Sequence, residues 1–161
     1  DPEICRALPE VLIAIANADL IILGPGSLYT SVIPNLLVSG IVEAIEQSSA
    51  KKIYVCNIMT QTGETDNYTV ASHVNALLNH AKGKKIIDAV LVNNSLPDNI
   101  SAGYAKNGSI PVILDNENLA PIGIEIVSQK LIQENKEGLV RHSSHRVARA
   151  VYCWYRKSLR K

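Results

Sequence analysis

The sequence contains no apolar run long enough to cross a membrane. A membrane-spanning helix needs about 20 consecutive apolar residues, whereas the longest run of large aliphatic side chains, Leu20–Leu23, ends at Gly24. The chain does not open on basic residues followed by an apolar stretch, so no signal peptide is recognisable. We therefore expect a protein without a membrane span.

Cysteine is scarce in this chain. The three cysteines, Cys5, Cys56 and Cys153, are odd in number and far apart in the sequence, which argues against a disulfide framework and a zinc knuckle. Unpaired cysteines are typical of a reducing compartment. We therefore expect the protein to be cytoplasmic.

Acidic residues are missing from the C-terminal end. All 15 of them precede residue 138, whereas residues 141–161 carry seven lysines and arginines. A basic tail can bind nucleic acid or an anionic membrane surface. Seven positive charges on one helix are, however, weak evidence for nucleic-acid binding. We favour a basic helix that packs on an acidic body, and do not expect a nucleic-acid partner.

The pattern of apolar residues predicts an α/β protein. Apolar residues make up 47% of the 161 residues and charged residues 19%, a balance that favours a packed core over disorder. Predicted strands, rich in Ile and Val, alternate with predicted helices. The strands are 20–23, 53–57, 87–93, 111–114 and 122–127, and the helices are 33–47, 70–81 and 144–159. This alternation is typical of a mostly parallel sheet, and with no visible boundary we interpret 1–161 as a single domain.

A glycine-rich segment, residues 24–31, follows the first predicted strand and opens a helix. It reads Gly-Pro-Gly-Ser-Leu-Tyr-Thr-Ser. In an open α/β sheet, ligands bind beyond the carboxyl ends of the strands, where glycines and a helix start can hold a phosphate. The segment is neither a dinucleotide fingerprint, since Tyr29 stands in place of the third glycine, nor a P-loop. A tight turn whose Ser or Thr caps the helix is an equally good interpretation.

A second polar segment, residues 57–66, follows the next strong strand. It reads Asn-Ile-Met-Thr-Gln-Thr-Gly-Glu-Thr-Asp, and its amides and hydroxyls suit a polar ligand. Glu64 and Asp66 could hold Mg²⁺ against a diphosphate. The alternative is a solvated loop in which Asp66 or Thr69 caps the next helix. Two polar loops at one edge of the sheet favour a functional role.

Histidines and one arginine supply the remaining candidates. Arg141 and His142 stand at the predicted start of the last helix, where a guanidinium suits an anionic ligand. His142 and His145 have no third ligand near them in the sequence and make a poor metal site. His73 lies on the apolar stripe of 70–81, where a histidine is more often a buried residue than a ligand. No nucleophilic triad is recognisable.

The segments 18–37 and 57–66 together closely resemble the gluconeogenesis factor (YvcK-like) branch of the 2-phospho-L-lactate transferase (CofD-like) family. The resemblance implies a Rossmann-like, three-layer fold in a protein of about twice this length. This chain would be its C-terminal half, without the Gly-rich N-terminal part. The branch implies a cytoplasmic, homo-oligomeric regulatory protein that binds a UDP-sugar such as UDP-N-acetylglucosamine. It is needed for cell shape and envelope homeostasis on gluconeogenic carbon sources.

The transferase branch of the family implies an alternative function. Its members move a phospholactyl group from a nucleotide diphosphate donor to a deazaflavin alcohol with Mg²⁺. In either case the resemblance places six residues by the phosphates, namely Gly24, Pro25, Gly26, Ser27, Leu28 and Tyr29. It also implies that the same cleft is lined by Asn57, Thr60, Gln61 and Glu64, with Tyr104 and Arg141 on the nucleotide-sugar. Ser72 departs from the family pattern, which commonly has Asp before the histidine at position 73.

Overall fold

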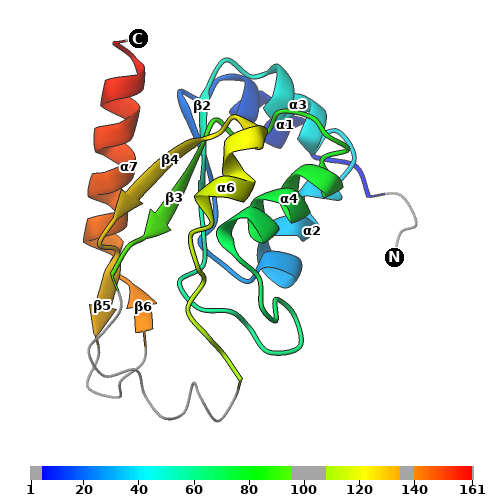
Figure 1. The fold of residues 1–161 in the computed structure, drawn as a ribbon. Coiled ribbons are helices and arrows are strands. Elements are labelled where there is room, and N and C mark those ends of the chain that lie inside the picture. The colour runs from blue at the N-terminus through cyan, green and yellow to red at the C-terminus, as the bar shows by residue number, and fades with distance from the viewer. Residues whose placement is uncertain (1–4, 96–107, 135–139, 161) are drawn as a thin grey trace.

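The structure is a computed structural model that describes residues 5–95, 108–134 and 140–160. Four parallel strands form its central sheet in the spatial order β1-β2-β3-β4. They are β1 (Leu20–Leu23), β2 (Lys51–Val55), β3 (Ala89–Asn93) and β4 (Glu125–Gln129). Because the strands run in one direction, their carboxyl ends all lie at one edge of the sheet, at the lower end in Figure 1.

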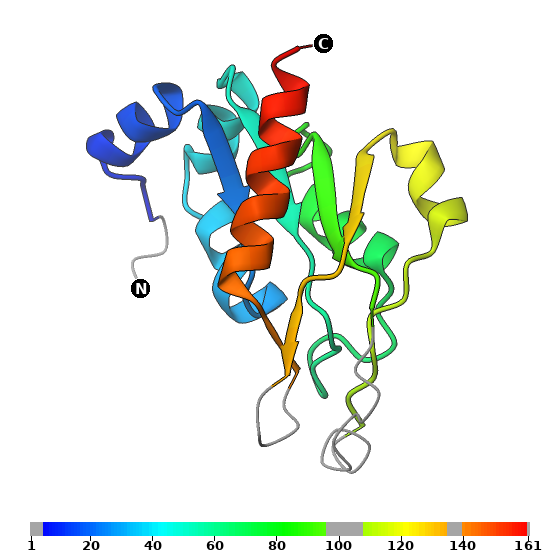
Figure 2. The ribbon, with the colours of Figure 1, turned by 90° about the vertical axis from the view of Figure 1, so that its left-hand side faces the viewer.

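Helices lie on both sides of this sheet, which confirms the predicted α/β class (Figure 1). On one side lie α1 (Pro9–Ala16), α2 (Ile33–Leu36), α3 (Ile41–Gln47), α4 (Val70–His80) and α6 (Asn116–Leu119). The other side carries α7 (Ser144–Ser158), which crosses the sheet in Figure 2. Short helical turns at Leu28–Val32 and Ala120–Ile122 complete the connections. Below α7, β5 (Ile132–Glu134) pairs antiparallel with β6 (Val140–His142).

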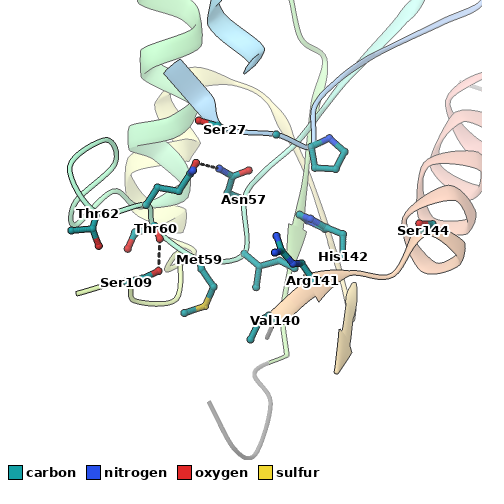
Figure 3. Close-up of a pocket in the computed structure, with 14 residues that line it drawn as sticks. Ser27, Asn57, Met59, Thr60, Thr62, Ser109, Val140, Arg141, His142 and Ser144 are labelled. Carbon is teal, nitrogen blue, oxygen red and sulfur yellow. Dashed lines mark hydrogen bonds between the residues drawn. The ribbon is translucent and has the colours of Figure 1, made fainter. Parts of the chain in front are cut away.

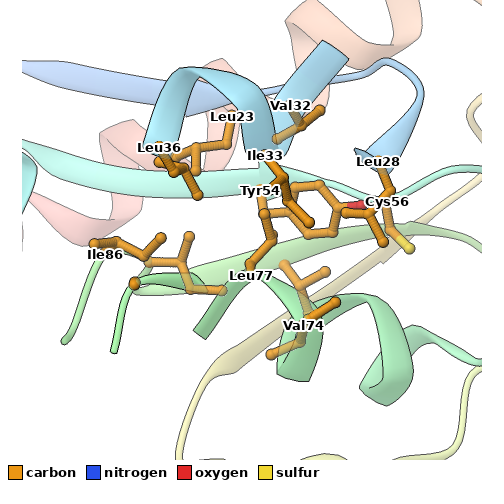
Figure 4. Packing of buried hydrophobic residues seen from close by; sticks show 14 of the residues in the cluster. Leu23, Leu28, Val32, Ile33, Leu36, Tyr54, Cys56, Val74, Leu77 and Ile86 are labelled. Carbon is orange, nitrogen blue, oxygen red and sulfur yellow. The ribbon is translucent and has the colours of Figure 1, made fainter. Parts of the chain in front are cut away.

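Each face of the sheet has its own apolar core. The larger core lies between the sheet and helices α2, α3 and α4, and includes the fully buried Leu28, Tyr54 and Leu77 (Figure 4). The smaller core joins Ile53, Val55, Ala89 and Leu91 of the sheet to Val151 and Trp154 of α7. Neighbouring residues of β2 from Ile53 to Val55 therefore enter different cores, which explains why this part of the strand is continuously apolar. The basic C-terminal segment packs on the sheet, as expected.

Two predicted elements differ in kind from the structure, and the strand predicted at 122–127 is found at Glu125–Gln129. The predicted helix 33–47 is two helices, because the chain turns at Gly40, whose φ of +94° favours glycine. The predicted strand 111–114 is wrong: among the described residues, its strand pairing is limited to an isolated bridge between Pro111 and Met59. A proline has no N–H to donate to a sheet, which explains the failure.

The described helices and the cysteines agree with what the sequence predicts about membrane spans and disulfides. Among the described residues, no helix is long and apolar enough to cross a membrane. Cys5, Cys56 and Cys153 are all free thiols. Cys56 is buried, and burial raises the pKa of its thiol to about 12, so it is an inert core residue rather than a nucleophile.

Candidate functional site

A cleft of about 1150 Å³ opens at the carboxyl edge of the sheet (Figure 3). The loops after β1 and β2 form one wall, and β6 forms the wall facing them. Its lining residues are Pro25, Gly26, Ser27, Asn57, Ile58, Met59, Thr60, Gln61, Thr62, Ser109, Val140, Arg141, His142 and Ser144. The two polar loops predicted to share one sheet edge therefore do meet in one cleft.

The glycine-rich loop contributes three of its residues to the lining. Gly24 has a φ of +78°, and a Cβ there would lie 3.0 Å from the Val55 carbonyl oxygen, so glycine is required where β1 passes β2. Pro25, Gly26 and Ser27 then line the cleft. Gly24 itself is not among the lining residues.

Leu28 and Tyr29, from the same loop, face away from the cleft. Leu28 is fully buried in the larger core. The Tyr29 hydroxyl lies 2.8 Å from the Tyr68 hydroxyl, and this hydrogen bond, with burial, raises the pKa of Tyr29 to about 12. The side chains of Leu28 and Tyr29 therefore anchor the loop. The loop residues available to contact a ligand are Pro25, Gly26 and Ser27.

The loop after β2 supplies three predicted residues to the lining, Asn57, Thr60 and Gln61. The Asn57 amide donates to the Gln61 side-chain oxygen at 3.4 Å. Thr60 is only 2% exposed, and its hydroxyl accepts from the Ile110 N–H at 2.9 Å. The Ser109 hydroxyl donates to the Thr60 carbonyl. Thr60 therefore fixes the segment that brings Ser109 to the cleft, a residue that the sequence did not indicate.

The two candidate metal-binding carboxylates lie outside the lining and are engaged elsewhere. Glu64 accepts hydrogen bonds from the Ser27 hydroxyl and the Tyr29 N–H, and Asp66 accepts from the Gly63 N–H at 2.8 Å. Among the described residues, no three His, Cys, Asp or Glu side chains lie close enough to share a metal ion. Mg²⁺ prefers carboxylate oxygens, and none of the described lining residues supplies one.

Arg141 and His142 form the opposite wall, and the structure places them in β6 rather than at the start of the last helix. Arg141 is exposed. Burial lowers the pKa of His142, an effect partly offset by a hydrogen bond to the Cys56 backbone. Its Nε2 has no hydrogen-bond partner among the described residues. The sequence pairs His142 with Arg141 as candidates but predicts both at a helix start, because β6 is too short to be recognised.

Charge distinguishes this cleft from an ordinary polar surface. Arg141 is the one fully charged side chain among the described lining residues, and none of them is Asp or Glu. Hydroxyl and amide side chains make up most of the remaining polar lining, from Ser27, Asn57, Thr60, Gln61, Thr62, Ser109 and Ser144. Such a cleft suits an anionic ligand that also carries hydroxyl groups. Tyr104, the other predicted ligand residue, lies outside the described residues.

Comparison with known proteins assigns the family. The model of the family described as 2-phospho-L-lactate transferase CofD matches residues 1–132. The chain belongs to the CofD family. All the described lining residues from the loops after β1 and β2 fall within the matched part, whereas Arg141 and His142 lie beyond it.

Two similar relatives are named as gluconeogenesis factors. A putative gluconeogenesis factor from Nostoc sp. is 49% identical over 150 residues, which is 92% of this chain and 33% of the relative. The gluconeogenesis factor of Bacillus subtilis is 47% identical over 148 residues, 91% of this chain and 46% of the relative. These two alignments cover β6, and the chain spans only a third to a half of the length of these relatives.

A solved structure supports the fold directly. The crystal structure of a Bacillus halodurans protein superposes with a TM-score of 0.88 at 45% sequence identity. The match covers 94% of this chain and 48% of the Bacillus halodurans chain. The four-stranded parallel sheet and its helices therefore form about half of a larger family fold.

Proposed function

We propose that this chain provides a nucleotide-sugar-binding cleft in a regulatory protein, and that the ligand is a UDP-sugar such as UDP-N-acetylglucosamine. The observation that carries the proposal is the lining of the cleft. Arg141 faces hydroxyl and amide groups, with no carboxylate among the described lining residues. A UDP-sugar offers the matching chemistry, because an anionic diphosphate lies between a ribose and a sugar that are both rich in hydroxyls.

The size of the cleft supports a ligand of this class. Small-molecule sites usually occupy about 300–1,000 Å³, and this cleft measures about 1150 Å³. That volume accommodates a two-part ligand such as a nucleotide joined to a sugar. The ligand would lie across the ends of β1 and β2, where open α/β sheets bind nucleotides.

The name shared by the relatives supports the biological setting. The Bacillus subtilis relative is a gluconeogenesis factor, and we propose that this chain belongs to a cytoplasmic, homo-oligomeric protein that maintains cell shape and the envelope during growth on gluconeogenic carbon sources. Ligand occupancy would shift the protein between two states that a partner distinguishes. The alternative function is a transferase acting on a nucleotide diphosphate-linked donor, which the description of the family model favours.

Replacing Arg141 tests the proposed binding site. Arg141→Ala should weaken UDP-N-acetylglucosamine binding by at least about tenfold, since a charge-assisted contact to a phosphate is lost. Isothermal titration calorimetry measures the effect. The matched control is Arg149→Ala, which removes an exposed arginine of α7 that does not line the cleft. Equal affinities for the two variants would contradict the proposed site.

A further inference from the structure

Glu64 joins the loop after β1 to the loop after β2. The Ser27 hydroxyl lies 2.6 Å and 2.8 Å from the two carboxylate oxygens of Glu64. The backbone N–H of Tyr29 donates to Oε1 at 2.8 Å. One carboxylate oxygen, Oε1, thus receives both the hydroxyl and the amide. The first helical turn after β1, Leu28–Val32, therefore already holds an anion, supplied by the protein itself.

This contact leaves little room for a phosphate at the same place. A phosphate bound at the Tyr29 N–H would have to displace the Glu64 carboxylate or lie beside it. Like charges at such short separation repel, and the repulsion is stronger in a partly buried site than in water. The family resemblance places the phosphates along the loop from Gly24 to Tyr29, but the charge of Glu64 opposes that placement.

The hydrogen bonds of Ser27 point to the same conclusion independently. A serine hydroxyl has one hydrogen to donate and two lone pairs that accept. The Ser27 hydroxyl donates its hydrogen to Glu64, and one lone pair accepts a hydrogen bond from the Thr30 hydroxyl. Ser27 lines the cleft with a single lone pair left to use. It can accept from a ligand hydroxyl, but it has no hydrogen to give to a phosphate oxygen.

The facing wall has the opposite character. Arg141 and His142 come from β6, across the cleft from Ser27 and Thr60 (Figure 3). The guanidinium of Arg141 is positively charged and can only donate hydrogen bonds. The cleft therefore has a cationic, donating wall at β6. It has a neutral, accepting group at Ser27, which the half-buried carboxylate of Glu64 holds in place.

We propose that Glu64 is a positioning residue that closes the first turn to anions. The ligand then lies with its diphosphate on the Arg141 wall and a hydroxyl-bearing sugar or ribose against Ser27. This inference rests on the proposed function. It adds the orientation of the ligand in the cleft. It also assigns Glu64 a role other than metal binding.

Conservative and non-conservative replacements of Glu64 test this assignment. Glu64→Ala removes the hydrogen bonds that join the loop after β1 to the loop after β2. It should weaken UDP-N-acetylglucosamine binding by about tenfold or more. Glu64→Gln keeps an oxygen that accepts from both Ser27 and Tyr29, and should restore the affinity to within about threefold of wild type. The wild-type chain and Glu64→Gln should also lose affinity equally as salt rises, because the Arg141 contact is retained.

The Glu64→Gln variant distinguishes the possible outcomes, and it remains informative if Glu64→Ala does not fold. At least tenfold tighter binding in Glu64→Gln would place the diphosphate beside residue 64 and overturn the inference. Loss of binding, or of a Mg²⁺ effect seen in wild type, would make Glu64 a direct ligand and overturn it as well. In both cases the proposed function would stand. If the wild-type chain binds no nucleotide-sugar, the proposed function itself fails.

Discussion

His73 is completely enclosed by protein, although histidine can ionise near neutral pH. Its Nδ1 lies 2.8 Å from the Thr69 carbonyl oxygen, and its ring packs edge-on against Tyr68. Nε2 has no hydrogen-bond partner among the described residues. Burial lowers the pKa of His73, and the Thr69 contact and the Glu64 charge only partly oppose this shift. His73 is therefore a neutral core residue, the role that its place on an apolar stripe indicated.

The lowered pKa of His73 predicts how stability depends on pH. Below about pH 6.5, the ordinary pKa of histidine, the unfolded chain binds a proton that the folded chain resists. Folding stability should therefore be full above that pH and fall as the pH is lowered. His142, whose pKa is also lowered by burial, acts in the same direction. Urea denaturation at pH 7.5, 6.0 and 5.0 measures this dependence.

The variant His73→Asn isolates the contribution of this residue. Asparagine can still donate to the Thr69 carbonyl but does not titrate, so the loss of stability between pH 7.5 and pH 5.0 should be smaller than in wild type. Each unit of pKa depression corresponds to about 1.4 kcal/mol. Identical pH dependence in the two proteins would show that His73 ionises freely in the folded state, contrary to this account.

Among the elements, α7 provides a clear test of packing. Val151 and Trp154 are 4% and 5% exposed against β2 and β3. Trp154→Ala should lower the free energy of unfolding by about 3–5 kcal/mol, the usual cost of emptying an aromatic core site. Tyr152 on the same helix is 57% exposed, so Tyr152→Ala should cost no more than about 1 kcal/mol. Denaturant melts that rank the two variants equally would mean that α7 does not stabilise the sheet.

The elements that could be predicted are those whose apolar pattern reflects their surroundings. β2 and β3 lie between two cores, so their continuous apolar runs, residues 53–56 and 89–92, identified them. α4 presents a regular apolar stripe and is capped by Thr69, whose hydroxyl accepts from the Ser72 N–H at 3.2 Å. β5 and β6 were missed because each is only three residues long and pairs with the other rather than with the main sheet.

The candidate site was predictable only in part, because some of its residues are placed by contacts between distant parts of the sequence. The parallel sheet dictates that loops after neighbouring strands meet, so Ser27 and Asn57 could be placed at one edge. The engagement of Glu64 depends on a side-chain contact between residues 37 positions apart, which no local pattern encodes. The place of His142 depends on β6, a three-residue strand that the apolar pattern does not reveal.

For the whole molecule, the distribution of charge agrees with a cleft that attracts anions. The basic residues of the C-terminal segment begin at Arg141, so the wall of the cleft and the outer face of α7 come from one continuous basic stretch. A cleft lined by one sign of charge raises the local concentration of ligands of the opposite sign. The acidic residues near the cleft, Glu64 and Asp66, are engaged by backbone and hydroxyl groups instead.

A calorimetric titration of the 161-residue chain tests the central claim most directly. The panel is UDP-N-acetylglucosamine, UDP and GDP, each with and without Mg²⁺, and the ligand is recovered afterwards for analysis. The account predicts that UDP-N-acetylglucosamine binds more tightly than GDP, with little dependence on Mg²⁺, and is recovered intact. A preference for GDP, or cleavage of the nucleotide-sugar, would contradict a sensor and favour the transferase.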